Sequence, residues 1–430
     1  MRQGRLFWGR WAVALAAATT AVLVAPAAHA AWSSPFNVSP ATQSGFNPKV
    51  AVDDDGDAVF VWKDNLTGQI QARARSATGT LSAVQTLSGA AQAAFDPQVA
   101  VDADGDAVFT WERSDGDFLR IQARARSAAG ALSAVQNLSS PGRHAQDPQV
   151  AVDVSGDAVF AWNRFDGLDE RVQGVARSSA GVLSAVQTLS AAGESASAAQ
   201  VAVDSSGDAV FAWHRLDGTA FRVQARARSS AGALSGVQTL SPTAGAGAFF
   251  PDVAIGGSGD AVFTWTRYDG SFDRVQGRTR SAAGVLTPVE TLSAAGENAA
   301  EPQVAIDDGG DAVFAWHRFD GTNDRVQIRE RTAGGTLSSV QNLSPAGEDA
   351  QDAQVAVDTD GDGVVIWRNL AGLIQARTNS AHSVLGPVRT FSDSGSVADP
   401  QVAVDADGDA IATWRFFLAG NWRVRAAVGP

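Results

Sequence analysis

The chain has 430 residues, of which 45% are apolar and 18% are charged, a composition that excludes general disorder and favours a folded core. Its 46 acidic residues outnumber its 33 lysines and arginines, and the formal net charge is −13. Such a surface repels phosphates, so nucleic acid and anionic membranes are poor candidate partners. Cysteine is absent, which excludes disulfides, thiolate zinc sites and cysteine nucleophiles.

The first thirty residues have the pattern of a secretory signal peptide. Three arginines and no acid occupy residues 1–10, residues 11–25 are almost wholly apolar, and Ala28-His29-Ala30 provides a small-x-small cleavage pattern. The apolar run is shorter than the roughly 20 residues that cross a bilayer. We therefore expect residues 1–30 to be removed, and residues 31–430 to form a secreted, extracellular protein without membrane insertion, most simply a monomer.

One unit recurs eight times along the rest of the chain. Each copy contains a tryptophan, and successive tryptophans are 47 to 52 residues apart: Trp62, Trp111, Trp162, Trp213, Trp265, Trp316, Trp367 and Trp414. In every copy a Gly-Asp pair precedes the tryptophan, with the aspartate five residues before it. A fixed period of this length indicates a repeat architecture.

The second copy shows how one unit is expected to fold. Alternating or continuous apolar residues predict strands over Val99–Val101, Ala107–Arg113, Ile121–Arg126 and Leu132–Leu138. Asp104-Gly105 is a two-residue hairpin signal between the first two strands. No helical periodicity appears after residue 30. Four antiparallel strands repeated eight times predict an all-β fold, the eight-bladed β-propeller.

The two ends of the chain complement each other. The eighth unit stops after its third strand, and residues 32–41 align without gaps on residues 337–346, which include the fourth strand of an internal copy. An N-terminal strand that completes the last blade would close the ring and leave no open edge. In this respect the chain resembles the secreted repeat β-propellers of bacteria as a superfamily, and the resemblance covers residues 32–430 as one domain.

The first hairpins are acidic and raise the question of calcium. Four copies read Asp-x-Asp-Gly-Asp, as in Asp53-Asp55-Gly56-Asp57, which resembles the calcium loops of integrin-type propellers and EF-hands. The spacing differs by one residue, and four other copies lose a carboxylate but keep Gly-Asp. A turn that persists without its ligands favours a structural role, so we predict no cofactor and no metal ligands, with calcium as the alternative.

Two other patterns favour structure over chemistry. Five copies carry Trp-x-Arg-x-Asp-Gly-x-x-x-Arg or a close variant, for which we expect the tryptophan to pack between blades and the acid to pair with the last arginine across the second hairpin. His214 and His317 share the column after the tryptophan, a second-strand column expected to face away from the axis. We interpret them as isolated histidines, and we predict no catalytic residues.

When the eight copies are aligned, each aligned position forms a column. Columns whose residue differs between copies are free to specialise, and two such columns lie just before the first strand. They should stand where each blade enters the mouth of the central channel, and together they supply five carboxylates and four phenylalanines. Aromatic faces stack on sugar rings and carboxylates accept hydrogen bonds from sugar hydroxyls. The predicted ligand-binding residues are Phe46, Phe95, Asp96, Asp147, Phe249, Phe250, Glu301, Asp352 and Asp399. The alternative is that the phenylalanines plug the ring and the acids cap turns.

A second variable feature lies in the second hairpins. Blades seven, eight and one lack the Asp-Gly found in the other copies, and blade eight adds Phe416, Phe417 and Trp422. These three blades are neighbours in a closed ring, so one sector should be more apolar, either as a partner surface or as packing at the seam.

The regularity of the repeats leaves few polar residues for a catalytic set. We therefore favour a secreted, non-catalytic propeller that binds an extracellular glycan or a surface protein. The alternatives are a carbohydrate-active enzyme, glycosidase or lyase, that uses the channel-mouth carboxylates, and a structural scaffold.

Overall fold

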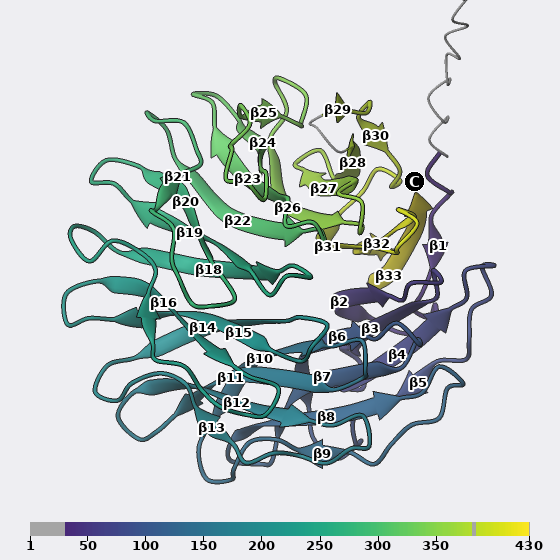
Figure 1. The fold of residues 1–430 in the computed structure, drawn as a ribbon. Helices are drawn as coiled ribbons and strands as arrows, with labels where there is room; N and C mark the ends of the chain where they lie inside the picture. Colours follow the sequence, from purple (N-terminus) through teal and green to yellow (C-terminus); the bar gives the residue numbers. More distant parts are fainter. Residues whose placement is uncertain (1–30, 381–383, 430) are drawn as a thin grey trace, which may run out of the picture. The chain divides into compact units, whose positions relative to one another are not determined.

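The computed structural model describes residues 31–380 and 384–429, and the predicted signal peptide lies outside this range. Within it the chain forms eight antiparallel sheets arranged as the blades of a closed ring (Figure 1). No described helix is long and apolar enough to cross a membrane. The predicted fold, an eight-bladed β-propeller, is confirmed.

Each blade has four strand positions, counted from the axis outwards. The innermost strands are β2 (Gly45–Val52), β6 (Ala94–Val101), β10 (Ala145–Val152), β14 (Ala196–Val203), β18 (Ala248–Ile255), β22 (Ala299–Ile306), β26 (Ala350–Val357) and β31 (Val397–Val404). The second strands are β3 (Ala58–Asp64), β7 (Ala107–Ser114), β11 (Ala158–Phe165), β15 (Ala209–Leu216), β19 (Ala261–Tyr268), β23 (Ala312–Phe319), β27 (Gly363–Asn369) and β32 (Ala410–Leu418).

In the outer half of each blade, the rim strand is much shorter than the third strand. The third strands are β4 (Gln69–Arg75), β8 (Leu119–Arg126), β12 (Glu170–Arg177), β16 (Phe221–Arg228), β20 (Asp273–Arg280), β24 (Asp324–Arg331), β28 (Leu373–Ser380) and β33 (Asn421–Gly429). The rim strands are β5 (Gln85–Thr86), β9 (Gln136–Asn137), β13 (Gln187–Thr188), β17 (Gln238–Thr239), β21 (Glu290–Thr291), β25 (Gln341–Asn342), β29 (Val384–Leu385) with β30 (Arg389–Thr390), and β1 (Phe36–Asn37).

The N-terminal strand closes the ring as predicted. β1 pairs with β33 in the eighth blade, where Phe36 lies opposite Ala426 and Asn37 opposite Arg425. Figure 1 shows the purple β1 beside the yellow C-terminal strands. Val38, just after β1, is fully buried, and its N–H donates to the carbonyl of Val424 at 2.9 Å. The termini are thereby held in one sheet.

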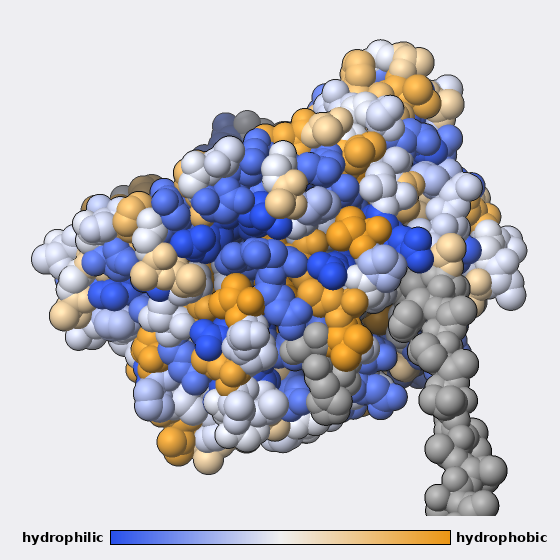
Figure 2. Space-filling view, turned by 90° about the horizontal axis from the view of Figure 1, so that it is seen from above, coloured by the Kyte–Doolittle hydropathy of each residue, from blue (hydrophilic) through white to orange (hydrophobic). Residues whose placement is uncertain are grey.

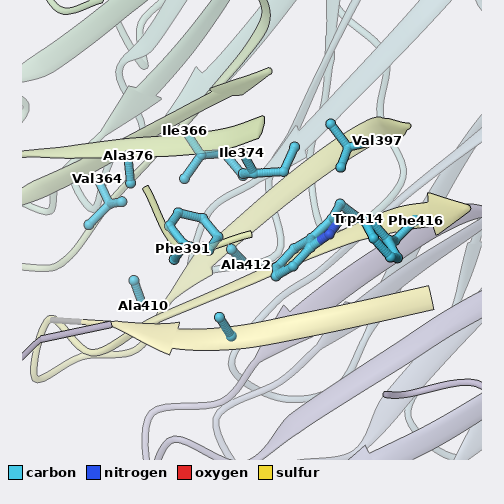
Figure 3. Close-up of a cluster of buried hydrophobic side chains, with 11 residues drawn as sticks. Val364, Ile366, Ile374, Ala376, Phe391, Val397, Ala410, Ala412, Trp414 and Phe416 are labelled. Atoms are coloured by element: carbon cyan, nitrogen blue, oxygen red, sulfur yellow. The ribbon is translucent and has the colours of Figure 1, made fainter. Parts of the chain in front are cut away.

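The core is divided into slabs between neighbouring blades. Each of the eight repeat tryptophans is fully buried, and Trp111 of blade two packs in one cluster with Ile70 and Leu87 of blade one. Figure 3 shows the slab between blades seven and eight, where Phe391 of blade seven lies beside Trp414 of blade eight. An aromatic ring of this size contributes the largest share of burial per residue, so the prediction that the tryptophans pack between blades is confirmed.

Polar side chains also connect adjacent blades. Gln85 of blade one donates to the carbonyl of Gly130 in blade two at 2.8 Å and accepts from Nε of Arg126 at 2.9 Å. The predicted ion pairs of the second hairpins are present in blades two to six, for example Asp217 with Arg222 at 2.7 Å. The shared polar columns therefore build the ring.

The first and fourth predicted strands of the second copy differ most from those in the structure. The first strand of the second copy begins at Ala94 rather than Val99, because a bulge at Asp96 and Pro97 hides its start in the sequence pattern. The fourth strand is reduced to Gln136–Asn137. Before it, Ser133 replaces the regular strand pairing: its Oγ accepts from the N–H of Ala125, and its carbonyl accepts from Nε of Arg124.

Candidate functional site

The site lies on the face of the ring that carries the second hairpins. Gly45 at the start of β2 pairs with Asp64 at the end of β3, so the start of each inner strand and each second hairpin share this face. We call it the mouth face. Figure 2 shows one side of the molecule, on which hydrophobic residues form small groups among hydrophilic ones.

A bulge near the start of each inner strand positions the mouth residues. In β2, Phe46 pairs with Lys63 and Lys49 with Val61, so Asn47 and Pro48 together oppose a single residue. The backbone at the bulged position is left-handed in all eight copies, with φ between 46° and 57°: Asn47, Asp96, Asp147, Ala198, Phe250, Glu301, Asp352 and Asp399. Asn and Asp tolerate this conformation best, and they occupy five of the eight positions.

These eight side chains surround one cavity in the centre of the ring. Its volume is about 530 Å³, within the range of small-molecule sites. Five of the predicted ligand-binding carboxylates line it: Asp96, Asp147, Glu301, Asp352 and Asp399. Deeper residues of the same strands supply Lys49 and six glutamines, Gln98, Gln149, Gln200, Gln303, Gln354 and Gln401. The cavity is therefore rich in groups that hydrogen-bond to hydroxyls.

The four predicted phenylalanines separate into two kinds. Phe250 lines the cavity and is 60% exposed. Phe46, Phe95 and Phe249 are not among its lining residues. Phe46 packs against Trp422 with ring centroids 6.1 Å apart, and Lys63 Nζ lies 4.1 Å above the ring of Phe95. Whether any of the nine residues binds a ligand stays a prediction.

Phe250 is the exposed edge of an aromatic cluster between blades four and five. Its ring centroid lies 6.3 Å from that of Phe249 and 6.3 Å from that of His214. Phe221 completes the cluster, 4.9 Å from His214 and 5.4 Å from Phe249. These tilted and edge-on contacts are favourable aromatic geometries, so the cluster gives Phe250 a firm support at the mouth.

His214 is an uncharged member of this cluster. Its Nε2 lies 3.1 Å from Ser197 Oγ, its Nδ1 has no hydrogen-bond partner among the described residues, and burial lowers its pKa to about 4. His317 lies in blade six, where its Nδ1 is 3.5 Å from Oε2 of Glu301 in the same blade. The two histidines thus serve separate blades, as the sequence suggested.

The residue after the tryptophan is not among the residues that line the cavity, but in several blades it contacts the left-handed residue that is. Asn163 Nδ2 donates to Asp147 Oδ2 at 2.8 Å, and Arg368 Nε donates to Asp352 Oδ2 at 2.7 Å. These positions vary from copy to copy, which is a signal that could have placed all of them beside the mouth: Lys63, Glu112, Asn163, His214, Thr266, His317, Arg368 and Arg415.

Two sides of the mouth differ in charge balance. On the side of blades seven, eight and one, Arg368 pairs with Asp352 and Arg415 with Asp399, each at 2.7 Å. Lys49 Nζ donates to Gln401 at 3.1 Å, and burial lowers the pKa of this lysine. We call this the paired sector (Lys49, Asp352, Arg368, Asp399 and Arg415).

On the other side, carboxylates meet the aromatic cluster. Glu112 accepts the N–H of Asp147 at 2.7 Å, and burial, together with repulsion from Asp96 and Asp147, raises its pKa to about 7. Burial and the charge of Asp147 also raise the pKa of Glu170, which lies near Ser197. We call this the aromatic–acidic sector (Glu112, Asp147, Glu170, Ser197, Ala198, His214, Phe221, Phe249 and Phe250).

The first hairpins lie at the opposite face and their aspartates are engaged by the backbone. Asp53 Oδ1 accepts the N–H groups of Asp55 and Asp57, at 3.1 and 2.8 Å. Asp57 in turn accepts the N–H of Ala77 at 2.7 Å. Among the described residues, no group of three or more His, Asp or Glu side chains is placed to hold a metal ion. These contacts account for the repeated aspartates as turn-capping residues.

The apolar sector predicted at blades seven, eight and one is partly surface and partly seam. Phe416 is buried beneath Arg425, and Trp422 packs against Phe417 with centroids 5.5 Å apart. Four large side chains of these second hairpins stay exposed, namely Leu66, Leu370, Phe417 and Leu418. We call these four residues the apolar hairpin patch.

Comparisons with known proteins concern the fold. No protein-family model matches the chain, and no curated protein matches it. The BP39L lectin from Burkholderia pseudomallei is similar in structure, with a TM-score of 0.56 and 12% identity over 81% of this chain and 99% of that one. The Dos1 propeller gives a TM-score of 0.52 at 12% identity, covering 93% and 95% of the two chains.

A third similar structure is prolyl oligopeptidase B from Galerina marginata, with a TM-score of 0.51 and 11% identity over 86% of this chain and 55% of that one. Identities this low establish a shared fold and carry no activity across. The strand order and these likenesses together identify the chain as a β-propeller.

Proposed function

We propose that this protein is a secreted, non-catalytic binding protein whose ligand is an extracellular glycan held at the channel mouth. The observation that carries the proposal is Phe250, a bulky residue with φ of 51° whose ring is 60% exposed at a cavity otherwise lined mainly by carboxylates, carboxamides and prolines. A bulky side chain in left-handed backbone is an uncommon strain, and such strain concentrates at functional sites.

The chemistry of the mouth suits a sugar. The exposed ring offers a face on which a pyranose can stack. The surrounding carboxylates accept hydrogen bonds from hydroxyl groups, and the glutamines both accept and donate them. One structurally similar protein is named as a lectin, so glycan binding is compatible with this fold.

The mouth carboxylates favour binding over hydrolysis. Asp96 accepts from Asn47 Nδ2 at 2.7 Å, Asp147 accepts from Asn163, and Glu301 lies beside His317. The two others, Asp352 and Asp399, pair with arginines. A glycosidase needs a free acid and a base or nucleophile flanking the bond, and each carboxylate here already has a partner.

The test is a glycan-binding screen of the mature chain, followed by calorimetry on the best ligand. Phe250→Ala should weaken binding about fivefold, because stacking on one aromatic face contributes on the order of 1 kcal/mol. Phe95→Ala is the matched control, since Phe95 does not line the cavity. Equal binding by the Phe250 variant would place the site elsewhere. Release of shortened glycan products would favour the enzyme alternative.

A surface protein is the second candidate ligand, and the apolar hairpin patch is the observation that favours it. Its four exposed large side chains lie on three neighbouring blades, and exposed apolar residues on one part of a surface are typical of partner sites. Binding to a partner that is lost in Phe417→Asp and kept in Phe250→Ala would support this candidate.

A further inference from the structure

We propose that the glycan bound at the mouth carries free, positively charged amino groups, as a de-N-acetylated hexosamine polymer does, and that the aromatic–acidic sector recognises them. This inference rests on the proposed function and names the ligand class of that same site. It follows from the unequal charge balance of the two sides of the cavity and from the aromatic surface that lies beside the excess acids.

The carboxylates of the aromatic–acidic sector have only neutral hydrogen-bond donors. Glu112 accepts a backbone N–H, Asp147 accepts a carboxamide N–H from Asn163, and Glu170 lies near the hydroxyl of Ser197. None of the three takes part in an ion pair between described residues, whereas Asp352 and Asp399 of the paired sector each have an arginine. At pH 6 Glu112, whose pKa is about 7, is mostly protonated, so Asp147, which lines the cavity, is the counter-charge that a ligand cation would meet on this side of the mouth.

The aromatic cluster adjoins these acids. Ser197 Oγ, which lies near Glu170, is 3.1 Å from His214 Nε2, and the His214 ring contacts both Phe249 and Phe250. An ammonium group near the face of an aromatic ring is attracted by its quadrupole, most strongly where water is displaced. Carboxylates beside an aromatic face thus favour an ammonium group over a neutral acetamide.

His214 lies behind this side of the mouth. The side chain is about nine-tenths buried against the lining residue Phe250, and its Nδ1 has no partner within the described residues. Because the ring is neutral at pH 7, it leaves the negative charge of the neighbouring acids uncompensated.

The shape of the mouth leaves room at this point. Ala198 is the smallest of the eight left-handed residues, and it stands between Asp147 and Phe250 in the order of the ring. Gln149 and Gln200 line the cavity on the same side and offer carboxamides to hydroxyl groups. An amino sugar carries both a cation, which the carboxylates can bind, and several hydroxyls, which the glutamines can bind.

The experiment compares two hexamers of equal length at pH 6, fully de-N-acetylated and fully N-acetylated chitohexaose, by calorimetry on the mature chain. We expect the amino form to bind at least about tenfold more tightly, because one charge-assisted hydrogen bond between an ammonium group and a carboxylate is enough for a difference of this size. Glu170→Gln and Phe250→Ala should each reduce that preference. Asp320→Asn is the control, because Asp320 lies in a second hairpin of the same face, paired with Arg325, and does not line the cavity.

Each outcome is decisive. Equal affinity for the two hexamers would overturn the charge inference and leave the proposed function standing, as would tight binding of neutral glycans alone. A preference for the amino form that persists unchanged in both variants would refute the assignment to this sector. If hexalysine binds as tightly as the amino hexamer, the site recognises a basic peptide and the sugar assignment is wrong. If no glycan binds, the proposed function fails and this inference fails with it. Melting temperatures of the variants show that they are folded.

Discussion

Glu112 allows a quantitative test of the electrostatics at the mouth, through the substitution Glu112→Gln. The side chain is 3% exposed, accepts the N–H of Asp147 at 2.7 Å, and has a pKa raised to about 7, mainly by burial. Glutamine has nearly the same shape and keeps a carbonyl oxygen for that N–H. The variant therefore removes the charge with little change in packing.

The sign of the effect follows from the direction of the pKa shift. The folded protein holds the Glu112 proton more tightly than the unfolded chain, whose carboxyl has a pKa near 4.5. Below about pH 4.5 the carboxyl is protonated in both states, and its contribution to stability is complete. As the pH rises through 7, this contribution is lost. A shift of this size corresponds to about 3 kcal/mol, which the neutral variant never loses.

Differential scanning calorimetry at pH 4.5 and pH 8.5, at one scan rate, measures this difference. For about 400 folded residues the unfolding entropy is about 0.8 kcal/mol/K, so the melting temperature of Glu112→Gln relative to wild type should rise by about 4 °C between the two pH values. Glu290→Gln is the control, because Glu290 pairs with Arg331 at 3.2 Å and its loss should not stabilise the protein at high pH. A pH-independent difference would show that the Glu112 charge is compensated and refute the reasoning.

Three further predictions concern the scaffold. Val38→Ala, which truncates a fully buried side chain of the closing segment, should lower the free energy of unfolding by about 2 kcal/mol, measured by chemical denaturation, whereas Val135→Ala, at an exposed position, should change it by less than about 0.5 kcal/mol. Equal effects would mean that the N-terminal segment does not hold the ring closed. Asp166→Ala removes an exposed ion pair with Arg171 and should shift the melting temperature by no more than about 1 °C. Calcium or EDTA should leave the melting temperature unchanged, because the backbone already engages Asp53; a rise with calcium would make the first hairpins metal sites.

The architecture could be predicted from the sequence because the repeat supplies eight independent readings of one pattern. The buried tryptophans, the ion pairs of the second hairpins and the closing strand all follow from residues that recur or align, such as Trp111 and Asp217. The start of the inner strands could not be predicted, because a left-handed residue, in most copies followed by proline, looks like a loop in sequence. That error concealed the contact between the mouth and the column of Asn163 and Arg368.

The site itself could be predicted only in part, because inter-blade packing decides which side chains reach the cavity. Phe249 and Phe250 are adjacent in sequence, but the bulge directs one against His214 and Phe221 and brings the other to the cavity. Alternation along a regular strand would have assigned their directions, and a bulge interrupts that alternation. The variable columns therefore indicated the correct end of the ring, and the geometry was needed to choose among their members.

Some left-handed positions hold residues that suit this backbone conformation, and others hold residues that do not. Asn or Asp occupies this position in five blades, and the three exceptions, Ala198, Phe250 and Glu301, belong to consecutive blades, four to six. An alanine in left-handed backbone costs about 1 kcal/mol more than an asparagine. Three strained positions side by side, next to the aromatic cluster, indicate that this part of the mouth is shaped for something other than stability.

Ala198→Asn tests that conclusion. The variant should raise the melting temperature by about 1 °C, because asparagine relieves the backbone strain. It should also weaken binding of the amino hexamer, because the larger side chain fills the space between Asp147 and Phe250. Ala398→Asn, at a position whose φ is not left-handed, is the control and should give no gain in stability. A variant that is more stable and binds equally well would show that the small residue at 198 has no role in recognition.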